Sequence, residues 1–261
     1  PMGYLYFRVF NTHFTYHPYH WLPIGFMEDI LAWKIEDIRD FYQRYYQPSN
    51  AILVVAGDIT PEEVYSESEK YFGHIKNKHR IPKVTAVEPK VDGAKRALLH
   101  KESNQVDTLA ITYAIPNYEH DDQVALSAIS HILSSGKSSR FEKTLVNEKQ
   151  LANQIYGYNM ELADPGVFLI MGMCSPHASV ETLEKEILAE IEKIKNGDVT
   201  QAELDKVKIN TKEEFIYSLE SSSSVAGLYG DYLVKGNIQP LLEYEEKLDK
   251  ITLKDISDTA K

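Results

Sequence analysis

The 261 residues include 28 Lys and Arg against 39 Asp and Glu, which gives a formal net charge of -11, and 43% of them are hydrophobic. This length and composition are typical of a soluble globular protein of about two domains and exclude a disordered or fibrous chain. The acidic balance argues against nucleic acid as a partner, because it repels a phosphate backbone. No apolar run approaches the ~20 residues that cross a bilayer, so no membrane span is expected.

Cysteine content and the first residues say little about the compartment. The single cysteine, Cys174, lies in an apolar run and is expected to be a buried, inert thiol. No basic start followed by an apolar stretch marks a targeting signal near the first residue. Localisation is therefore left open.

The first 75 residues predict three helices and one strand. Apolar residues at helical spacing predict helices over 4–14 and 35–46. The β-branched run at 50–57 predicts a strand that is buried on both faces. A Thr-Pro-Glu-Glu sequence then predicts a helix over 60–72, because the threonine and the second glutamate can cap its first turn.

The following segment loses periodicity and collects Lys, His, Pro and Gly, which is typical of a linker between domains. The sequence therefore predicts a first domain at 1–78, a linker at 79–93 and a second domain at 94–261. We expect limited proteolysis to cut first near this linker, between residues 76 and 93.

Strands and helices are segregated beyond the linker, so the predicted fold class is α+β. The expected elements are strands at 94–101 and 108–115, a helix at 121–133, a hairpin at 155–173, and helices at 180–194 and 200–215. A stripe from Tyr217 to Tyr232 predicts that the last helix continues, with a local irregularity, across the serines at 221–224.

A weak internal repeat indicates two homologous domains. Residues 28–40 can be laid over residues 246–258 at an offset of 218, with three acidic and three aliphatic positions in common. The chain is then expected to begin inside one domain and to end inside its duplicate, so that the counterpart of the strand at 50–57 lies beyond Lys261.

That strand needs a partner. A lone strand leaves both edges unpaired, which is not an independently stable arrangement. The partner can be an upstream strand of the same gene product, a second copy of the chain, as in a homo-oligomer, or the sheet built from 94–173. Where the upstream segment is absent, we expect residues 50–57 to pair either with another molecule or with that sheet.

Short motifs occur in an order and spacing that resemble a known peptidase family. In the first part they are His17-Pro18-Tyr19, Pro23-Ile24-Gly25, Glu28-Asp29-Ile30, Phe41 to Asn50 and Val54 to Asp58. In the second part they are Ser138 to Phe141, Asp164 to Phe168 and Phe215 to Ser221. Together they resemble the second half of the first domain, and then the second domain, of bacterial two-domain members of the insulinase, pitrilysin and mitochondrial processing peptidase family.

The resemblance implies a pair of homologous α+β domains that close around a peptide, with zinc held by a His-x-x-Glu-His helix and a distant Glu. That chemistry needs two imidazoles one turn apart and a carboxylate that activates the bound water. None of the nine histidines is followed by Glu-His at the third and fourth positions; they are His13, His17, His20, His74, His79, His100, His120, His131 and His177. The resemblance places the zinc ligands before Pro1, so no catalytic or metal residue is expected in this chain.

The resemblance also implies which residues contact the substrate, and they follow the first helix of the second domain. It assigns Ser138, Ser139 and Arg140 to the substrate cavity. Members that bind peptide through this domain carry an Arg and a Tyr shortly afterwards, where this sequence has Val146 and Asn153. A homologous partner subunit is then expected to supply that Arg/Tyr pair, with peptide as the substrate.

Two functions remain open. The first is a fragment of a zinc-dependent metalloendopeptidase, and the alternative is a non-catalytic structural or partner subunit of the same family. His13, His17 and His20, at spacings of four and three, could face a metal, but Pro18 ends the helix between them and no acidic ligand falls in register. A native metal site there is not favoured.

Overall fold

The structure is a computed structural model that describes residues 2–102 and 106–261. The chain divides into two compact units. The helical unit comprises residues 1–100 and 221–234, and the sheet unit comprises residues 101–220 and 235–261.

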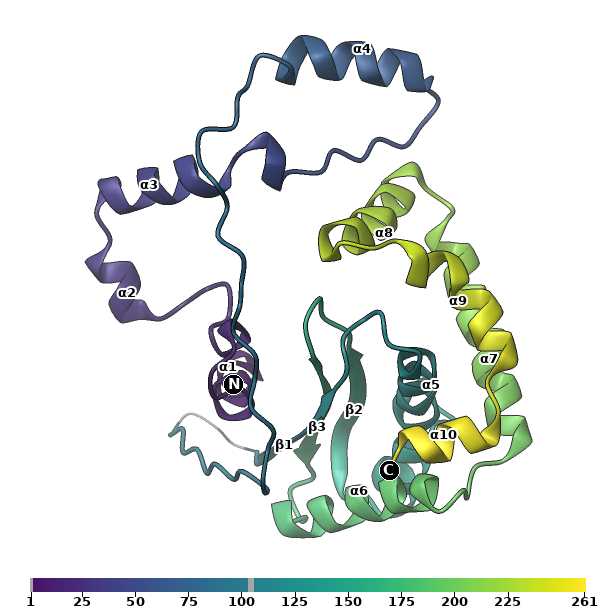
Figure 1. Ribbon diagram of the computed structural model, residues 1–261. Helices are drawn as coiled ribbons and strands as arrows, with labels where there is room; N and C mark the ends of the chain where they lie inside the picture. Colours follow the sequence, from purple (N-terminus) through teal and green to yellow (C-terminus); the bar gives the residue numbers. More distant parts are fainter. Residues whose placement is uncertain (1, 103–105) are drawn as a thin grey trace. The chain divides into compact units, whose positions relative to one another are not determined.

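The helical unit confirms the three helices expected in the first 75 residues (Figure 1). Its helices are α1 (Met2–His13), α2 (Met27–Ala32), α3 (Ile35–Tyr45), α4 (Pro61–Phe72) and most of α8 (Ser222–Lys235), with 3-10 turns η1 (Pro18–His20) and η2 (Pro48–Asn50). The expected cap of α4 is present, because Thr60 N–H donates to Glu63 Oε2 at 2.9 Å and Glu63 N–H donates to Thr60 Oγ1 at 3.3 Å.

The predicted strand at 50–57 is wrong. Ala51 has an extended backbone, but residues 51–56 have no ladder partner among the described parts of the chain. Ile52, Leu53 and Val55 are about half exposed rather than buried on both faces. A strand exists only through its hydrogen-bonded neighbours, so a β-branched run without them stays an isolated extended segment. The expected pairing with the sheet of 94–173 is therefore wrong for the described residues, whereas pairing with another molecule stays a prediction.

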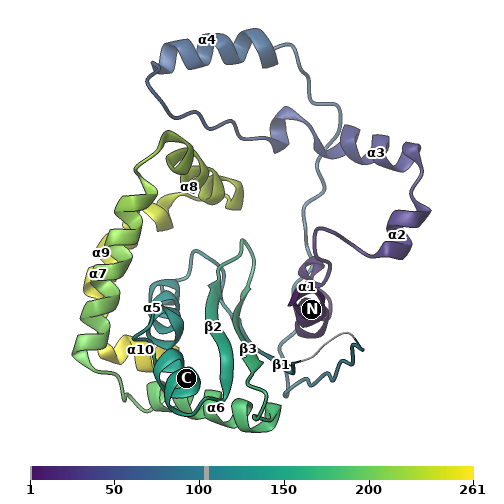
Figure 2. The same cartoon turned by 180° about the vertical axis from the view of Figure 1, so that it is seen from behind.

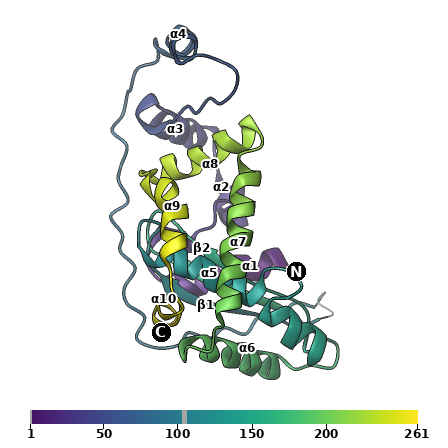
Figure 3. The ribbon, with the colours of Figure 1, turned by 90° about the vertical axis from the view of Figure 1, so that its right-hand side faces the viewer.

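A long segment without helix or strand leaves α4 and returns past the C-terminal end of α1 (Figures 1 and 3). We call its residues 78–95 the strap. Glu88 accepts hydrogen bonds from the backbone N–H groups of Thr15, Tyr16 and His17 at 2.6, 2.9 and 2.8 Å. Farther along, Lys95 Nζ donates to the carbonyl of His13 at 2.8 Å. These bonds satisfy the backbone where the chain turns after α1, and they attach the strap to it.

The sheet unit contains one antiparallel sheet in the order β1-β3-β2 (Figures 1 and 2). The strands are β1 (Thr108–Ile115), β2 (Ala152–Met160) and β3 (Gly166–Cys174). This confirms the expected strand at 108–115 and the hairpin at 155–173. The strand expected at 94–101 is wrong, because those residues have no ladder partner among the described ones.

The helices of the sheet unit include the three that the sequence predicts at 121–133, 180–194 and 200–215. The helices of this unit are α5 (Asp122–Ser134), the π-helix η3 (Glu142–Glu148), α6 (Val180–Lys195), α7 (Gln201–Ser218), α9 (Gln239–Lys250) and α10 (Leu253–Thr259). Figure 3 shows α7 passing along α5, with α6 below them in that view. One expectation needs refinement, because the helix expected to cross serines 221–224 is broken at residues 219–221 into α7 and α8.

The core of the sheet unit lies between one face of the sheet and its helices, which confirms the α+β class. Ile155, Phe168 and Ile170 point from the strands into a cluster with apolar residues of α5 and α6. Gly172 keeps this face open for α6, because a Cβ there would lie 3.2 Å from Leu183 Cδ2. In addition, the hydroxyls of the α5 residues Ser130 and Ser134 both donate to the carbonyl of Gly157 in β2 at 2.9 Å.

The two copies of the repeat have the same local structure. In the first copy, α3 begins after Lys34, whose N–H donates to Asp37 Oδ2 at 2.9 Å. In the second, α10 begins after Thr252, whose N–H donates to Asp255 Oδ2 at 2.8 Å. Both helices therefore start at positions related by the offset of 218, each with an aspartate at the third position of the cap.

Candidate functional site

The three predicted cavity residues lie on the turn that connects α5 to the π-helix. Gly136 has a φ of +74° there, a conformation that glycine adopts without steric cost. The N–H of Ser139 then donates to the carbonyl of Gly136 at 3.1 Å, which closes the turn. The turn thus places Ser138, Ser139 and Arg140 next to the first half of α7.

Arg140 is held by α7 and by the loop before it. Its Nε donates to Glu203 Oε1 at 2.7 Å, and its Nη2 donates to Glu203 Oε2 at 2.9 Å. The same nitrogen donates to the carbonyl of Asp198 at 2.5 Å. Only 13% of the Arg140 side chain is exposed, and its hydrogen bonds connect the turn after α5 to α7 and to the loop before α7.

The electrostatics of this pair follow from its geometry. Burial alone would raise the pKa of Glu203, but hydrogen bonds from Arg140 and from Thr200 outweigh it and lower that pKa to about 2. Thr200 takes part because Glu203 also completes the cap of α7. The carboxylate is therefore ionised and saturated with donors.

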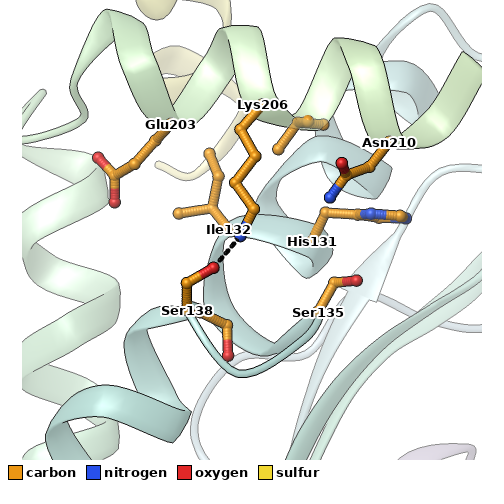
Figure 4. Close-up of a pocket in the computed structure, with 9 residues that line it drawn as sticks. His131, Ile132, Ser135, Ser138, Glu203, Lys206 and Asn210 are labelled. Atoms are coloured by element: carbon orange, nitrogen blue, oxygen red, sulfur yellow. Dashed lines mark hydrogen bonds between the residues drawn. The ribbon is translucent and has the colours of Figure 1, made fainter.

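Beside this pair a small pocket opens between α5 and α7, with a volume of about 30 Å³ (Figure 4). It is lined by His131, Ile132, Ser135, Ser138, Ser139, Glu203, Lys206, Val207 and Asn210. A volume of this size has room for about one or two water molecules. It cannot hold a whole side chain of a peptide.

Polar atoms without protein partners face this region. Figure 4 shows the Lys206 side chain reaching from α7 to Ser138, to whose hydroxyl its ammonium donates. The hydroxyl of Ser139 and Nδ1 of His131 are buried, and neither has a hydrogen-bond partner among the described residues. Native proteins leave few such groups unpaired, so these two atoms are the polar groups of the pocket that the protein itself does not satisfy.

The structure thus brings two of the three predicted residues into one pocket. Ser138 and Ser139 line it, whereas the guanidinium of Arg140 is engaged by Glu203. Sequence reasoning missed Lys206 and Asn210. Their spacing of four places them on one face of α7, but no sequence signal shows that this face meets α5.

The positions expected to carry the Arg/Tyr pair lie elsewhere in the sheet unit. Val146 lies in the π-helix and is partly buried against the core. Asn153 is exposed at a bulge in β2, where its Oδ1 accepts a hydrogen bond from the hydroxyl of Ser175 at 3.2 Å. Supply of the missing pair by a partner stays a prediction.

Within the described residues, no three His, Cys, Asp or Glu side chains are grouped so as to hold a metal. Of the histidines weighed above, His17 Nδ1 accepts from the N–H of Tyr19 at 3.2 Å, and His20 Nδ1 lies 2.8 Å from the carbonyl of Phe14. Cys174 is buried, and burial raises the pKa of its thiol, which disfavours the reactive thiolate. Among the helices that the structure describes, none has both the length and the apolar character of a membrane span.

The sequence is similar to members of a known peptidase family. Residues 32–211 match the model of the peptidase M16 inactive domain. The zinc protease PqqE of Helicobacter pylori is 48% identical over 258 residues, which cover 98% of this chain and 58% of that protein. The beta subunit of the mitochondrial processing peptidase of Saccharomyces cerevisiae is 24% identical over 246 residues, 89% of this chain and 53% of that protein. The chain spans little more than half the length of these relatives.

Solved structures agree. The crystal structure of a protease from Helicobacter pylori superposes with a TM-score of 0.97 at 47% identity, over all of this chain and 63% of that one. An M16 inactive domain from Pseudomonas fluorescens superposes with a TM-score of 0.79 at 19% identity, over 97% and 60% of the two chains, which shows the fold alone. The chain therefore belongs to the M16 family of zinc peptidases, that of insulinase, pitrilysin and the mitochondrial processing peptidase, and it matches the family's inactive domain.

Proposed function

We propose that this chain is the non-catalytic part of a zinc-dependent metalloendopeptidase that encloses peptides between two homologous domains. The observation that carries the proposal is the match to an inactive peptidase domain together with 48% identity to a zinc protease. In such an enzyme, zinc polarises the peptide carbonyl and activates a water molecule. The ligands and the water-activating carboxylate belong to residues outside this chain, because its sequence has no His-x-x-Glu-His motif.

Exposed apolar side chains in the helical unit support a larger parent protein. Helix α3 has no buried residue, and Ile35, Ile38 and Phe41 are each more than half exposed. An isolated helix of this length is marginal in water and depends on packing of its apolar face. We propose that this face packs against the part of the longer peptidase that the relatives contain and this chain does not.

A direct test compares this chain with the longer gene product that contains it. We expect the purified 261-residue chain to bind no stoichiometric zinc and to cleave no peptide, and we expect the longer product to do both, with activity lost on chelation. The measurements are zinc content by plasma mass spectrometry and cleavage of a quenched fluorescent peptide. Chelator-sensitive proteolysis by the 261-residue chain alone would refute the assignment.

The same measurements separate the alternative, a structural or partner subunit without activity. Both beta and alpha subunits of processing peptidases are among the relatives. A longer product that folds but holds no zinc would favour this alternative. Under either function we propose a homologous partner that supplies the Arg/Tyr pair, and co-purification with a homologue that carries the pair would test it.

A further inference from the structure

The pocket between α5 and α7 contains hydrogen-bond donors that no described residue accepts from. The ammonium of Lys206 has three donors, of which one is used by the Ser138 hydroxyl. Ser138 accepts that bond, so its own hydrogen is free to be donated. The buried hydroxyl of Ser139 has no partner among the described residues, and the amide of Asn210 also lines the wall.

Lys206 supplies a positive charge to the pocket wall, and the carboxylate of Glu214 lies outside the lining, 3.8 Å from Nε2 of His131. Glu203, the one carboxylate in its wall, is neutralised by Arg140. Lys206 has no carboxylate within ion-pair distance in the described parts of the chain. A cation without a counterion, next to free hydroxyl and amide donors, favours an acceptor-only, negatively charged guest.

The volume of the pocket limits which negatively charged ligands can enter it. Its volume of about 30 Å³ is too small for a nucleotide or a sugar. The two oxygens of a carboxylate replace about two waters and match that space. The mouth is accessible, because Lys206 and Ser138 are exposed while Ser139 forms the buried end.

We propose that this pocket is a carboxylate-binding subsite, in which Lys206, Ser138 and Ser139 bind one carboxylate of a peptide. The class of ligand follows from the donors themselves, and only its identification as part of a peptide rests on the proposed function. The carboxylate can come from a peptide's C-terminus or from an Asp or Glu side chain.

The test is a titration of the 261-residue chain, followed by amide chemical shifts in NMR. Acetate is the first probe, and three N-acetylated peptides follow: one with a free C-terminus, its amide, and an amide that contains glutamate. We expect shifts at the pocket and weak, saturable binding of acetate and of the free acid. Lys206→Gln should weaken binding about tenfold, because it removes a charge-assisted hydrogen bond.

Two further variants make the result specific. Lys137→Gln is the matched control, since it removes the same charge from a neighbouring residue that does not line the pocket, and it should change affinity less than twofold. Ser139→Ala should weaken binding severalfold without lowering the thermal stability of the chain, because its hydroxyl makes no bond within the protein.

Each outcome is decisive. Binding of the free acid but not of either amide supports a C-terminal carboxylate, and binding of the glutamate-containing amide supports a side chain. The proposal is overturned if the amide without glutamate causes the same shifts, if Lys206→Gln leaves the affinity unchanged, or if no probe binds and the pocket holds water only. Acetate binding does not depend on proteolysis, so this result is independent of whether the longer product is a peptidase.

Discussion

Arg140 and Glu203 are joined by two hydrogen bonds of 2.7 and 2.9 Å, although 63 residues separate them in the sequence. Through this pair the turn after α5 is attached to the first turn of α7. The geometry has both oxygens of the carboxylate facing two nitrogens of the guanidinium, which is the strong form of the interaction. The pair therefore fixes the position of the serines that line the pocket.

Breaking this pair should destabilise the sheet unit. Glu203→Gln leaves the guanidinium of Arg140 mostly buried without its counterion, and the expected loss is about 2–3 kcal/mol in the free energy of unfolding. Urea unfolding followed by circular dichroism measures it. Glu213→Gln, an exposed position on the same helix, is the control and should stay within about 0.5 kcal/mol of the wild type. Equal stability of the two variants would show that the pair contributes nothing.

The same pair predicts a pH dependence. The pKa of Glu203 is lowered from 4.5 to about 2 in the folded protein, so its stabilisation is complete above its ordinary pKa. It is lost as the pH falls from about 4.5 through about 2, and below that pH the carboxylate is protonated in both the folded and the unfolded state. We expect the stability difference between wild type and Glu203→Gln to shrink over this window. A difference that stays constant from pH 6 to pH 2.5 would contradict the lowered pKa.

Local patterns predicted the helices well, because their signals are local. The caps of α4 and α7 were readable from Thr60 and Thr200 with a glutamate three residues later, and both are present. The strands at 50–57 and 94–101 were wrong because composition reports β-propensity, whereas a strand depends on neighbours that composition does not specify.

The candidate site shows the same limit. A contiguous motif singles out the turn residues Ser138 and Ser139, and their assignment to a substrate cavity stays a prediction. Lys206 could not be predicted, since it reaches the pocket only through the packing of α7 on α5. The engagement of Arg140 by Glu203 was equally invisible, because the capping pattern of α7 already explained the glutamate.

The strap predicts a change in protease sensitivity. Glu88→Gln replaces one accepting oxygen with an amide donor that faces backbone N–H groups, so the strap should detach from α1 more often. We expect tryptic cleavage after Lys83 and Lys90 to become severalfold faster, as measured by mass spectrometry of a time course.

Asp92→Asn is the matched control for this variant. It makes the same chemical change within the strap at an exposed position. Cleavage of this control should match the wild type. If both variants are cut at the same rate, the bonds of Glu88 do not hold the strap.

The beginning of the strap is fixed by Gln47, which is 5% exposed. Its Oε1 accepts hydrogen bonds from the backbone N–H groups of Lys78 and His79 at 2.5 and 2.8 Å, and its Nε2 donates to the carbonyl of His79 at 3.0 Å. Gln47→Leu keeps the bulk but removes these three bonds and the one that Nε2 donates to the carbonyl of Arg44 at 2.6 Å. The backbone amides of Lys78 and His79 should then lose hydrogen-exchange protection by about tenfold, which corresponds to about 1.4 kcal/mol of local opening. Gln43→Leu, on the exposed face of α3, makes the same change without these contacts and should leave both amides as protected as in the wild type. Unchanged exchange in Gln47→Leu would show that the strap is held at this end by something other than Gln47.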